Sequence, residues 1–368
     1  MTVDLPTVLA RRMVTQRMVG PPLPSAVAAV ELLTCVQAQE FGHALWSLGM
    51  RSNGRASEIT AVFDAGDLLR THILRPTWHL VAPADLSWIL AATSERVHLR
   101  NAGMYRQAGI GPDTVARSRD LLTEMLAGNR SLTRPEIGER LAAGGIGRPT
   151  GMRLTYLVMH AELDGLVVSG PLRGSQHTYA LAAERLAGRS VSSPDDPIAE
   201  LWRRFVAGHG PTSVRDFARW SSLTLTTARA AAARVADQLD STNVGGEELW
   251  TDPDTRSGDP DQMAEAAEAV RLVPLYDELT LSYPRLNFPL SPRHPHPPGE
   301  DVRWGSVIAG LTNVGLWRRT LVDGRRRSVR LATTLDPTIS PDRRVAVGIE
   351  LDRLASFLQA ETVGEDWA

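Results

Sequence analysis

The feature that most constrains the fold is a pattern that recurs three times along the chain, namely short helices followed by a β-hairpin. In the first copy, residues 25–36 have the apolar periodicity of a helix and a second helix begins at Ser57. Strands are predicted at 68–74 and 77–81, and a long helix opens at Pro83. Helices followed by a hairpin are typical of a winged-helix unit.

The second copy has the clearest signals at the ends of its elements. Thr133 stands at the start of a predicted helix with Glu136 three residues later, which is the pattern of a capping box. The copy as a whole predicts helices at 113–126, 133–143 and 152–163 and strands at 166–169 and 178–181. The loop between the strands has the length and composition of a wing.

The third copy is followed by a region of a different character. Helices are predicted at 197–208, 213–220 and 224–237, with a strand from 239. After an acidic stretch, the pattern turns to strands at 270–275, 301–311, 314–322 and 328–334, with a tight turn at 322–324 and a closing helix at 351–361. We expect an α+β fold of three tandem winged-helix units with a C-terminal β-rich, barrel-like part, divided as 1–105, 106–190, 191–270 and 271–368.

Composition limits the chemistry. Hydrophobic residues make up 43% and charged residues 22% of the 368 residues, and no window approaches the run of about 20 apolar residues that a membrane span needs. The N-terminal segment lacks the apolar block of a signal peptide, so we expect a cytoplasmic protein. The single cysteine, Cys35, excludes an internal disulfide and multi-cysteine metal centres. Because the chain contains no lysine, Schiff-base chemistry on a lysine is excluded as well.

Charge is distributed unevenly, although the formal net charge is only −2. The segment from Glu247 to Glu268 contains eight acidic residues and only one arginine. The predicted hairpin from Trp317 to Arg330 is instead rich in arginine, with Arg318, Arg319, Arg325, Arg326, Arg327 and Arg330 opposed only by Asp323. Such a hairpin is a candidate for contact with nucleic-acid phosphates. The alternative is a solvated edge hairpin that its charges protect from aggregation.

Two glutamines separated by one alanine follow the first predicted helix. In a helix, Gln37 and Gln39 would point about 200° apart, whereas an extended segment would turn them to the same side. Gly42 and the loss of apolar periodicity after Val36 favour the extended form. The alternative is a polar helix end whose glutamines face water.

Four motifs together carry a resemblance to a known family. They are Val36-Gln37-Ala38-Gln39, Arg75-Pro76-Thr77-Trp78-His79-Leu80-Val81, Leu275-Tyr276-Asp277-Glu278 and Gly315-Leu316-Trp317-Arg318-Arg319. In these motifs, and over essentially its whole length, the sequence resembles the winged-helix DNA glycosylases of the AlkZ type, which confer resistance to azinomycin. The resemblance implies that the three units surround a DNA channel and that Gln37 and Gln39 are the catalytic pair.

The implied reaction is hydrolysis of the N-glycosidic bond of N7-alkylguanine, including guanine held in an interstrand crosslink. N7-alkylation makes the purine a cationic leaving group, so an uncharged carboxamide that orients water suffices. Close relatives carry Asp at the second position, and Gln39 places this chain with the crosslink-unhooking members. Glu40 is an alternative base. We further expect no lyase activity, because the chain lacks a lysine nucleophile, and no metal or cofactor.

The partner implied is double-stranded DNA, bound by a monomer. We expect His79 to contact DNA or line the lesion pocket beside Trp78, with a satisfied core histidine as the alternative. His294 and His296 lie in a proline-rich loop without supporting metal ligands. Two rival functions are a winged-helix regulator that reads operator DNA and a protein that sequesters a drug. The predicted third helices of the units are poor in arginine, which argues against the regulator.

Overall fold

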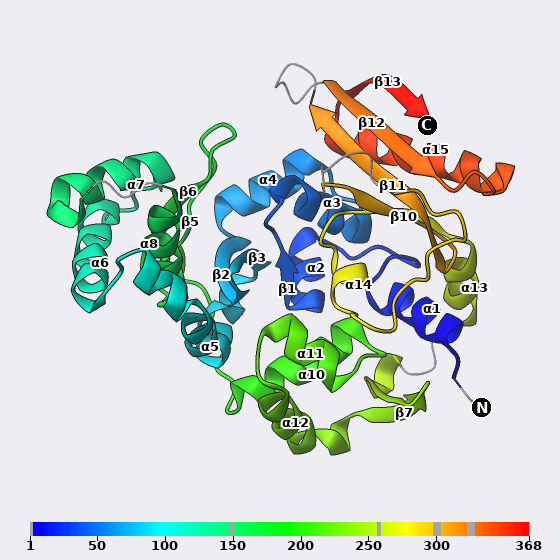
Figure 1. Ribbon diagram of the computed structural model, residues 1–368, viewed down its shortest axis with the longest axis horizontal. Coiled ribbons are helices and arrows are strands. Elements are labelled where there is room, and N and C mark those ends of the chain that lie inside the picture. Colours follow the sequence, from blue (N-terminus) through cyan, green and yellow to red (C-terminus); the bar gives the residue numbers. More distant parts are fainter. Residues whose placement is uncertain (1–2, 148–150, 256–258, 297–302, 322–327, 368) are drawn as a thin grey trace.

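The computed structural model describes residues 3–147, 151–255, 259–296, 303–321 and 328–367. Within these ranges, no helix combines the length and the apolar character that crossing a membrane requires. The second and third repeats and a C-terminal sheet are arranged around the first repeat, which lies at the centre of Figure 1.

The first unit follows the N-terminal helix α1 (Leu5–Thr15) and supplies the central sheet. Its elements are α2 (Ala26–Leu33), β1 (Cys35–Gln37), α3 (Phe41–Ser52), α4 (Ala56–Ala65), β2 (Leu69–Arg75) and β3 (Thr77–Val81). The three strands are antiparallel in the order β1-β3-β2, so β3 lies in the middle. The helical turn η1 (Pro83–Asp85) and the long helix α5 (Leu86–Gln107) then lead to the second unit.

The second unit repeats the same order of elements. It contains α6 (Pro112–Leu126), β4 (Leu132–Thr133), α7 (Arg134–Leu141), η2 (Ala142–Ile146), α8 (Gly151–Leu163), β5 (Val167–Ser169), β6 (Thr178–Leu181) and the short α9 (Ala182–Arg185). Its sheet has the order β4-β6-β5, equivalent to that of the first unit. This unit forms the lobe on the left of Figure 1 and has a hydrophobic core of its own.

The third unit has a shorter sheet. It consists of α10 (Pro197–His209), α11 (Val214–Ser221), α12 (Leu225–Arg234), η3 (Ala236–Gln238), β7 (Asp240–Val244) and β8 (Glu247–Thr251). Thr212 takes the place of the first strand, because it exchanges both backbone hydrogen bonds with Trp250 of β8. The core of this unit continues into α5 and the sheet of the first unit.

The C-terminal region is a five-stranded sheet with its helices. After η4 (Pro253–Thr255) come α13 (Pro260–Glu268), β9 (Val270–Val273), α14 (Glu278–Leu281), β10 (Gly305–Ala309), β11 (Thr312–Leu321), β12 (Ser328–Leu335), α15 (Pro341–Leu358) and β13 (Glu361–Trp367). The strand order is β13-β12-β11-β10-β9, and this sheet shares one hydrophobic core with the first unit. The C-terminal part is β-rich as expected, and its sheet is a half-barrel bounded by β9 and β13.

Several expected boundaries were wrong. The first helix ends at Leu33, not at Val36, because Thr34 adopts a φ of 65° and Cys35 begins β1. Helices α1, α3 and α13 and strand β13 are among the elements that were not predicted, and α15 begins ten residues before the predicted closing helix. The predicted turn at 322–324 lies outside the described residues. The hairpins of the first two units were predicted correctly to within about two residues.

Candidate active site at the glutamine junction

The segment that joins β1 to α3, residues 37–40, is here named the glutamine junction. Two hydrogen bonds hold its backbone at Ala38, since the Ala38 N–H donates to the Trp78 carbonyl at 2.7 Å and Arg70 Nε donates to the Ala38 carbonyl at 3.0 Å. Strand β1 ends at Gln37, and the chain bends at Gln39 and Glu40. The Ala38 side chain is fully buried and anchors the segment. The extended form is therefore present at Gln37, and the same-side orientation of Gln37 and Gln39 stays a prediction.

The two glutamines differ in depth. Gln37 is the last residue of β1 and is 8% exposed, whereas Gln39 is exposed. The buried Gln37 Oε1 finds no hydrogen-bond partner among the described residues. A buried acceptor without a partner is costly in a native protein and demands an explanation. A carboxamide oxygen in this position is suited to accept a hydrogen bond from a water or a ligand.

A buried carboxylate, Glu278, holds the backbone at Gln37. Glu278 Oε1 accepts the Gln37 N–H at 3.1 Å, and Oε2 accepts hydrogen bonds from Trp220 Nε1 at 3.0 Å and Ser282 Oγ at 2.8 Å. Burial raises the pKa of Glu278, but the neighbouring His209, Arg75 and Ser282 outweigh it and lower this pKa to about 2. Glu278, on α14 of the C-terminal region, is therefore a carboxylate at neutral pH that fixes the end of β1.

His79 lies beside Gln37 on the central strand. The two residues are paired in the β1–β3 register, and His79 is fully buried. Its Nδ1 donates to the Thr77 carbonyl at 2.9 Å, which leaves Nε2 to accept from Arg75 Nη2 at 3.4 Å. Burial, reinforced by the Arg75 charge, lowers the pKa of His79 to about 3. His79 is thus a neutral, fully enclosed support of β1, and its burial argues against the direct contact with DNA that the sequence analysis expected.

A second layer connects the junction to the second unit. The Arg70 guanidinium stacks on the Trp78 ring at 4.3 Å, and Trp78 Nε1 donates to Glu162 Oε1 of α8 at 3.3 Å. The other Glu162 oxygen pairs with His72 of β2. The strand pair that holds the glutamines is therefore tied to helices of both neighbouring units.

Three of the six hairpin arginines, Arg318, Arg319 and Arg330, belong to the described residues, and Arg330 is exposed on β12. Arg318 stacks on Trp304 at 4.7 Å. Arg319 lies against the start of α3, so closely that a Cβ on Gly42 would overlap its guanidinium. Burial, and next the Arg319 charge, lower the pKa of His43 to about 4, so this histidine is neutral. Arg325, Arg326 and Arg327 lie outside the described residues.

A groove of about 540 Å³ lies beside the start of α3. Its walls come from the first unit, from the β5–β6 loop of the second unit, and from the C-terminal sheet and helix, with Phe41, Gly42, Thr60, His177, Arg319 and Phe357 among the lining residues. Phe41, two residues after Gln39 in the sequence, is therefore part of the groove wall. Glu40, the alternative base, lies between the two and precedes α3 without a side-chain hydrogen bond to the helix end.

Asp277 and Glu278 have structural roles that could not be assigned from the sequence. In the structure, Asp277 forms a fully buried, bidentate ion pair with Arg51 at 2.9 Å and caps the short helix α14, which carries Glu278. The motif Leu275-Tyr276-Asp277-Glu278 was the available signal, but Arg51 and Gln37, which it contacts, are more than two hundred residues away in the sequence.

The two loop histidines have no metal-like surroundings. His294 Nε2 lies 3.1 Å from Asn313 Oδ1. Neither His294 nor His296 belongs to a group of three potential metal ligands in the part of the chain that the structure describes.

Comparison with known proteins agrees with this architecture. The family model of AlkZ-like DNA glycosylases matches residues 30–357. An interstrand DNA cross-link repair glycosylase of Streptomyces sahachiroi is 28% identical over 230 residues, an alignment that covers 60% of this chain and 61% of that protein. The solved structure of Streptomyces sahachiroi DNA glycosylase AlkZ superposes with a TM-score of 0.77 at 21% identity and covers 100% of both chains, which shows a common fold. The chain belongs to the AlkZ-like DNA glycosylase family.

Proposed function

We propose that this protein is a monofunctional DNA glycosylase that hydrolyses the N-glycosidic bond of N7-alkylguanine, including guanine held in azinomycin-type interstrand crosslinks. Family membership supports the reaction class, and the name of the Streptomyces sahachiroi relative supports crosslinks as substrates. The observation that carries the proposal is the buried, unpartnered Oε1 of Gln37 on a rigidly held strand end.

In the proposed mechanism, Gln37 and Gln39 position the attacking water. The Gln37 carboxamide oxygen accepts a hydrogen bond from the water and the exposed Gln39 completes its orientation from the solvent side. The alkylated purine leaves as a neutral base without being protonated, since alkylation at N7 already makes it cationic. Water adds to the anomeric carbon, its proton passes to solvent, and the products are the free base and an intact abasic site.

Supporting residues hold this geometry without touching the substrate. Glu278 fixes the Gln37 N–H, Arg70 fixes the Ala38 carbonyl, and His79 lies opposite Gln37 on the adjacent strand β3. A site 1 Å out of place loses much of its rate, so these contacts matter for catalysis even at a distance. They are positioning residues.

We place the DNA along a channel between the three repeats, which we interpret as winged-helix units, and the C-terminal sheet, which closes one side. Arg319 and the groove beside α3 support this path, since a guanidinium next to a helix start is suited to a phosphate. Arg318 and the arginines at 325–327 extend the basic surface in the sequence. The groove is shared by several elements, which suits a crosslinked base that cannot be flipped into a closed pocket.

The test is release of base from duplex DNA that contains one N7-alkylguanine or one azinomycin-type crosslink. We expect free alkylated base, unhooked strands and an abasic strand that breaks only after alkali treatment. Strand cleavage by the protein alone would contradict the monofunctional assignment. Absence of base release, with either sequence-specific DNA binding or saturable binding of free drug, would replace the glycosylase by the regulator or the sequestering protein.

A further inference from the structure

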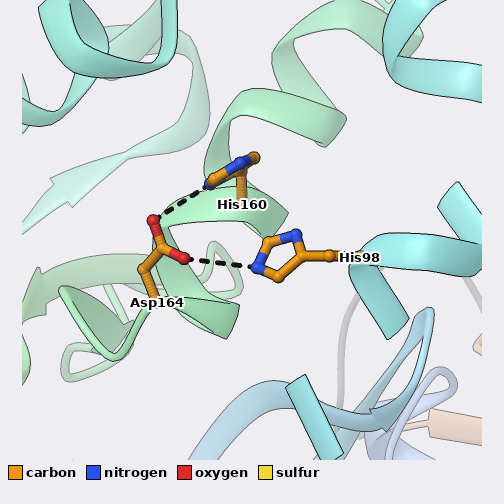
Figure 2. Close-up of side chains that lie close together, drawn as sticks. All are labelled: His98, His160 and Asp164. Atoms are coloured by element: carbon orange, nitrogen blue, oxygen red, sulfur yellow. Dashed lines mark hydrogen bonds and ion pairs between the residues drawn. The ribbon is translucent and has the colours of Figure 1, made fainter. Parts of the chain in front are cut away.

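The second unit carries a cluster of metal-ligating side chains that the proposed hydrolysis does not use. His98 comes from α5, and His160 and Asp164 come from the last turn of α8 and the residue that follows it. His98 Nε2 lies 3.2 Å from Asp164 Oδ1, and His160 Nδ1 lies 3.1 Å from Asp164 Oδ2. Figure 2 shows the three side chains directed at one another.

We propose that His98, His160 and Asp164 bind a divalent transition-metal cation of the Zn²⁺ class. One ligand atom from each residue can be chosen so that all three lie within 4.8 Å of one another. Ligand atoms of a tetrahedral zinc site are about 3.3 Å apart, since each lies about 2.0–2.2 Å from the ion. The separations of up to 4.8 Å must therefore shrink by as much as about 1.5 Å, through rotation of the side chains, to bring the three groups to bonding distance. A fourth position then remains for water.

The surroundings of His98 match those of a metal-bound histidine. Its second ring nitrogen, Nδ1, lies 3.2 Å from the hydroxyl of Tyr105, which is a buried residue of the same helix. When Nε2 binds an ion, Nδ1 carries the proton and donates it to this hydroxyl, which fixes the ring orientation. A phenol hydroxyl both donates and accepts, so Tyr105 serves either histidine tautomer.

The cluster is open to solvent on one side. The exposed fractions of the His98, His160 and Asp164 side chains are 23%, 21% and 28%, so an ion can enter without unfolding the unit. Arg119 Nη1, on a side chain that is 54% exposed, lies 3.5 Å from Asp164 Oδ2. This guanidinium competes with a cation for the carboxylate and must swing away when the ion binds.

Binding would brace the second unit. The ion would join α8 to α5, the helix that connects the second unit to the first. Glu162, two residues from both His160 and Asp164, faces the opposite side of α8 and contacts His72 and Trp78 of the first unit. The site departs from the sequence-based expectation of a metal-free chain, but it is structural and leaves the hydrolysis itself without a metal. The proposal does not depend on the glycosylase assignment.

The experiment is titration of the chelator-treated full-length protein with Zn²⁺, followed by competition with a chromophoric chelator. We expect the wild type to bind one equivalent of Zn²⁺ saturably. Each ligand variant, His98→Gln, His160→Gln or Asp164→Asn, should bind at least tenfold more weakly. The variant Tyr105→Phe, which removes only the hydroxyl, should bind about tenfold more weakly. Arg119→Gln should bind more tightly, because the competing cation is gone. His296→Gln, a change to an exposed histidine elsewhere, is the matched control and should bind as the wild type does.

Two results would overturn the site. One is the lack of saturable binding below about 100 µM Zn²⁺, which is a weak affinity limit for a structural zinc site. The other is binding that the three ligand variants leave unchanged. If a ligand variant fails to fold, Co²⁺ added to the wild type keeps the test decisive: visible absorption of a tetrahedral nitrogen–oxygen complex supports the site, and its absence contradicts it.

Discussion

The strand-to-helix junctions of the first and second units occupy equivalent places in equivalent topologies, yet they end differently. In the second unit β4 runs directly into α7, where Thr133 and Glu136 form a capping box. The third unit does the same with Ser213 and Asp216 after the bridging residue Thr212. In the first unit three residues intervene after β1, and Glu40 caps α3 without a side-chain hydrogen bond.

The first junction lacks stabilising local interactions that the other two junctions have. The capping boxes satisfy backbone N–H groups at the helix starts of the second and third units. The glutamine junction has an incompletely capped helix, the unpartnered Oε1 of Gln37 and, just before β1, a threonine with a φ of 65°. A β-branched residue in that region is strained, and such strain tends to collect at functional sites. We therefore regard the first junction as the functional one and the other two as structural.

The largest expected effect is loss of the carboxylate that holds the first junction. Glu278→Gln places an amide NH₂ among the donors of Gln37, Trp220 and Ser282, so the free energy of unfolding should fall by about 3 kcal/mol. Urea unfolding measures it. Glu124→Gln, at an exposed position of the second unit, is the control and should change stability by no more than about 0.5 kcal/mol. Equal effects in the two variants would refute the role of Glu278.

Acid should destabilise the protein through the first unit. Burial lowers the pKa of His79 to about 3 and of His43 to about 4, whereas an unfolded histidine titrates near 6.5. The unfolded chain thus binds more protons below pH 6.5, and the stability present above that pH is lost as the pH falls toward these folded-state values. From pH 7.5 to 5.0 the free energy of unfolding should drop by about 2 kcal/mol for each histidine.

The variant His79→Gln separates this contribution from all others. It should show a pH dependence smaller by about 2 kcal/mol over the same interval, measured by urea unfolding at pH 7.5 and 5.0. If the free energy of unfolding of His79→Gln depends on pH as that of the wild type does, His79 is not held neutral in the folded protein.

The capping boxes should matter for stability alone. Thr133→Ala and Ser213→Ala each remove an N-cap side chain and should lower the free energy of unfolding by about 1 kcal/mol. Base release at a temperature well below the melting transition should stay within about twofold of the wild type. A large loss of excision in a protein that remains folded would mean that these junctions are also functional. The distinction between a functional first junction and two structural ones would then be wrong.

The smallest effect concerns the grip on DNA near the first junction. If Arg319 contacts one phosphate, Arg319→Gln should reduce the slope of log affinity against log salt by about 1, with a modest loss of affinity at physiological salt. Arg117→Gln changes an exposed arginine of the second unit and is the control. Identical salt slopes in the two variants and the wild type would show that Arg319 does not contact the DNA phosphate backbone.

The repeated topology could be predicted because its signals are local. Apolar periodicity, the Thr133–Glu136 capping box and the alternation around Arg75 and Pro76 each involve neighbours in the sequence. The end of α2 could not be predicted in this way, since Thr34 takes a positive φ without a glycine and Cys35 pairs with Val81 far along the chain. Tertiary pairing decided this boundary against local propensity.

The candidate site was predictable only in part. The extended form of the glutamine segment followed from the loss of helical period, and the structure confirms it for β1. The support of that segment could not be inferred, because Glu278, Arg70 and His79 reach it through long-range packing. His79 and Trp78 illustrate the limit: the sequence indicated their proximity to the glutamines, but not that His79 would be fully enclosed.

The most direct test of the contrast between the junctions is single-turnover base release from duplex DNA with one N7-alkylguanine, with enzyme in excess and DNA occupancy matched. Gln37→Ala, Gln39→Ala and the control Thr133→Ala are compared with the wild type. We predict that each glutamine variant loses excision by about a hundredfold or more with DNA binding retained, equivalent to about 2.7 kcal/mol of transition-state stabilisation, while Thr133→Ala excises normally. Normal excision by both glutamine variants would contradict the account and move the chemistry to Glu40 or to another part of the groove.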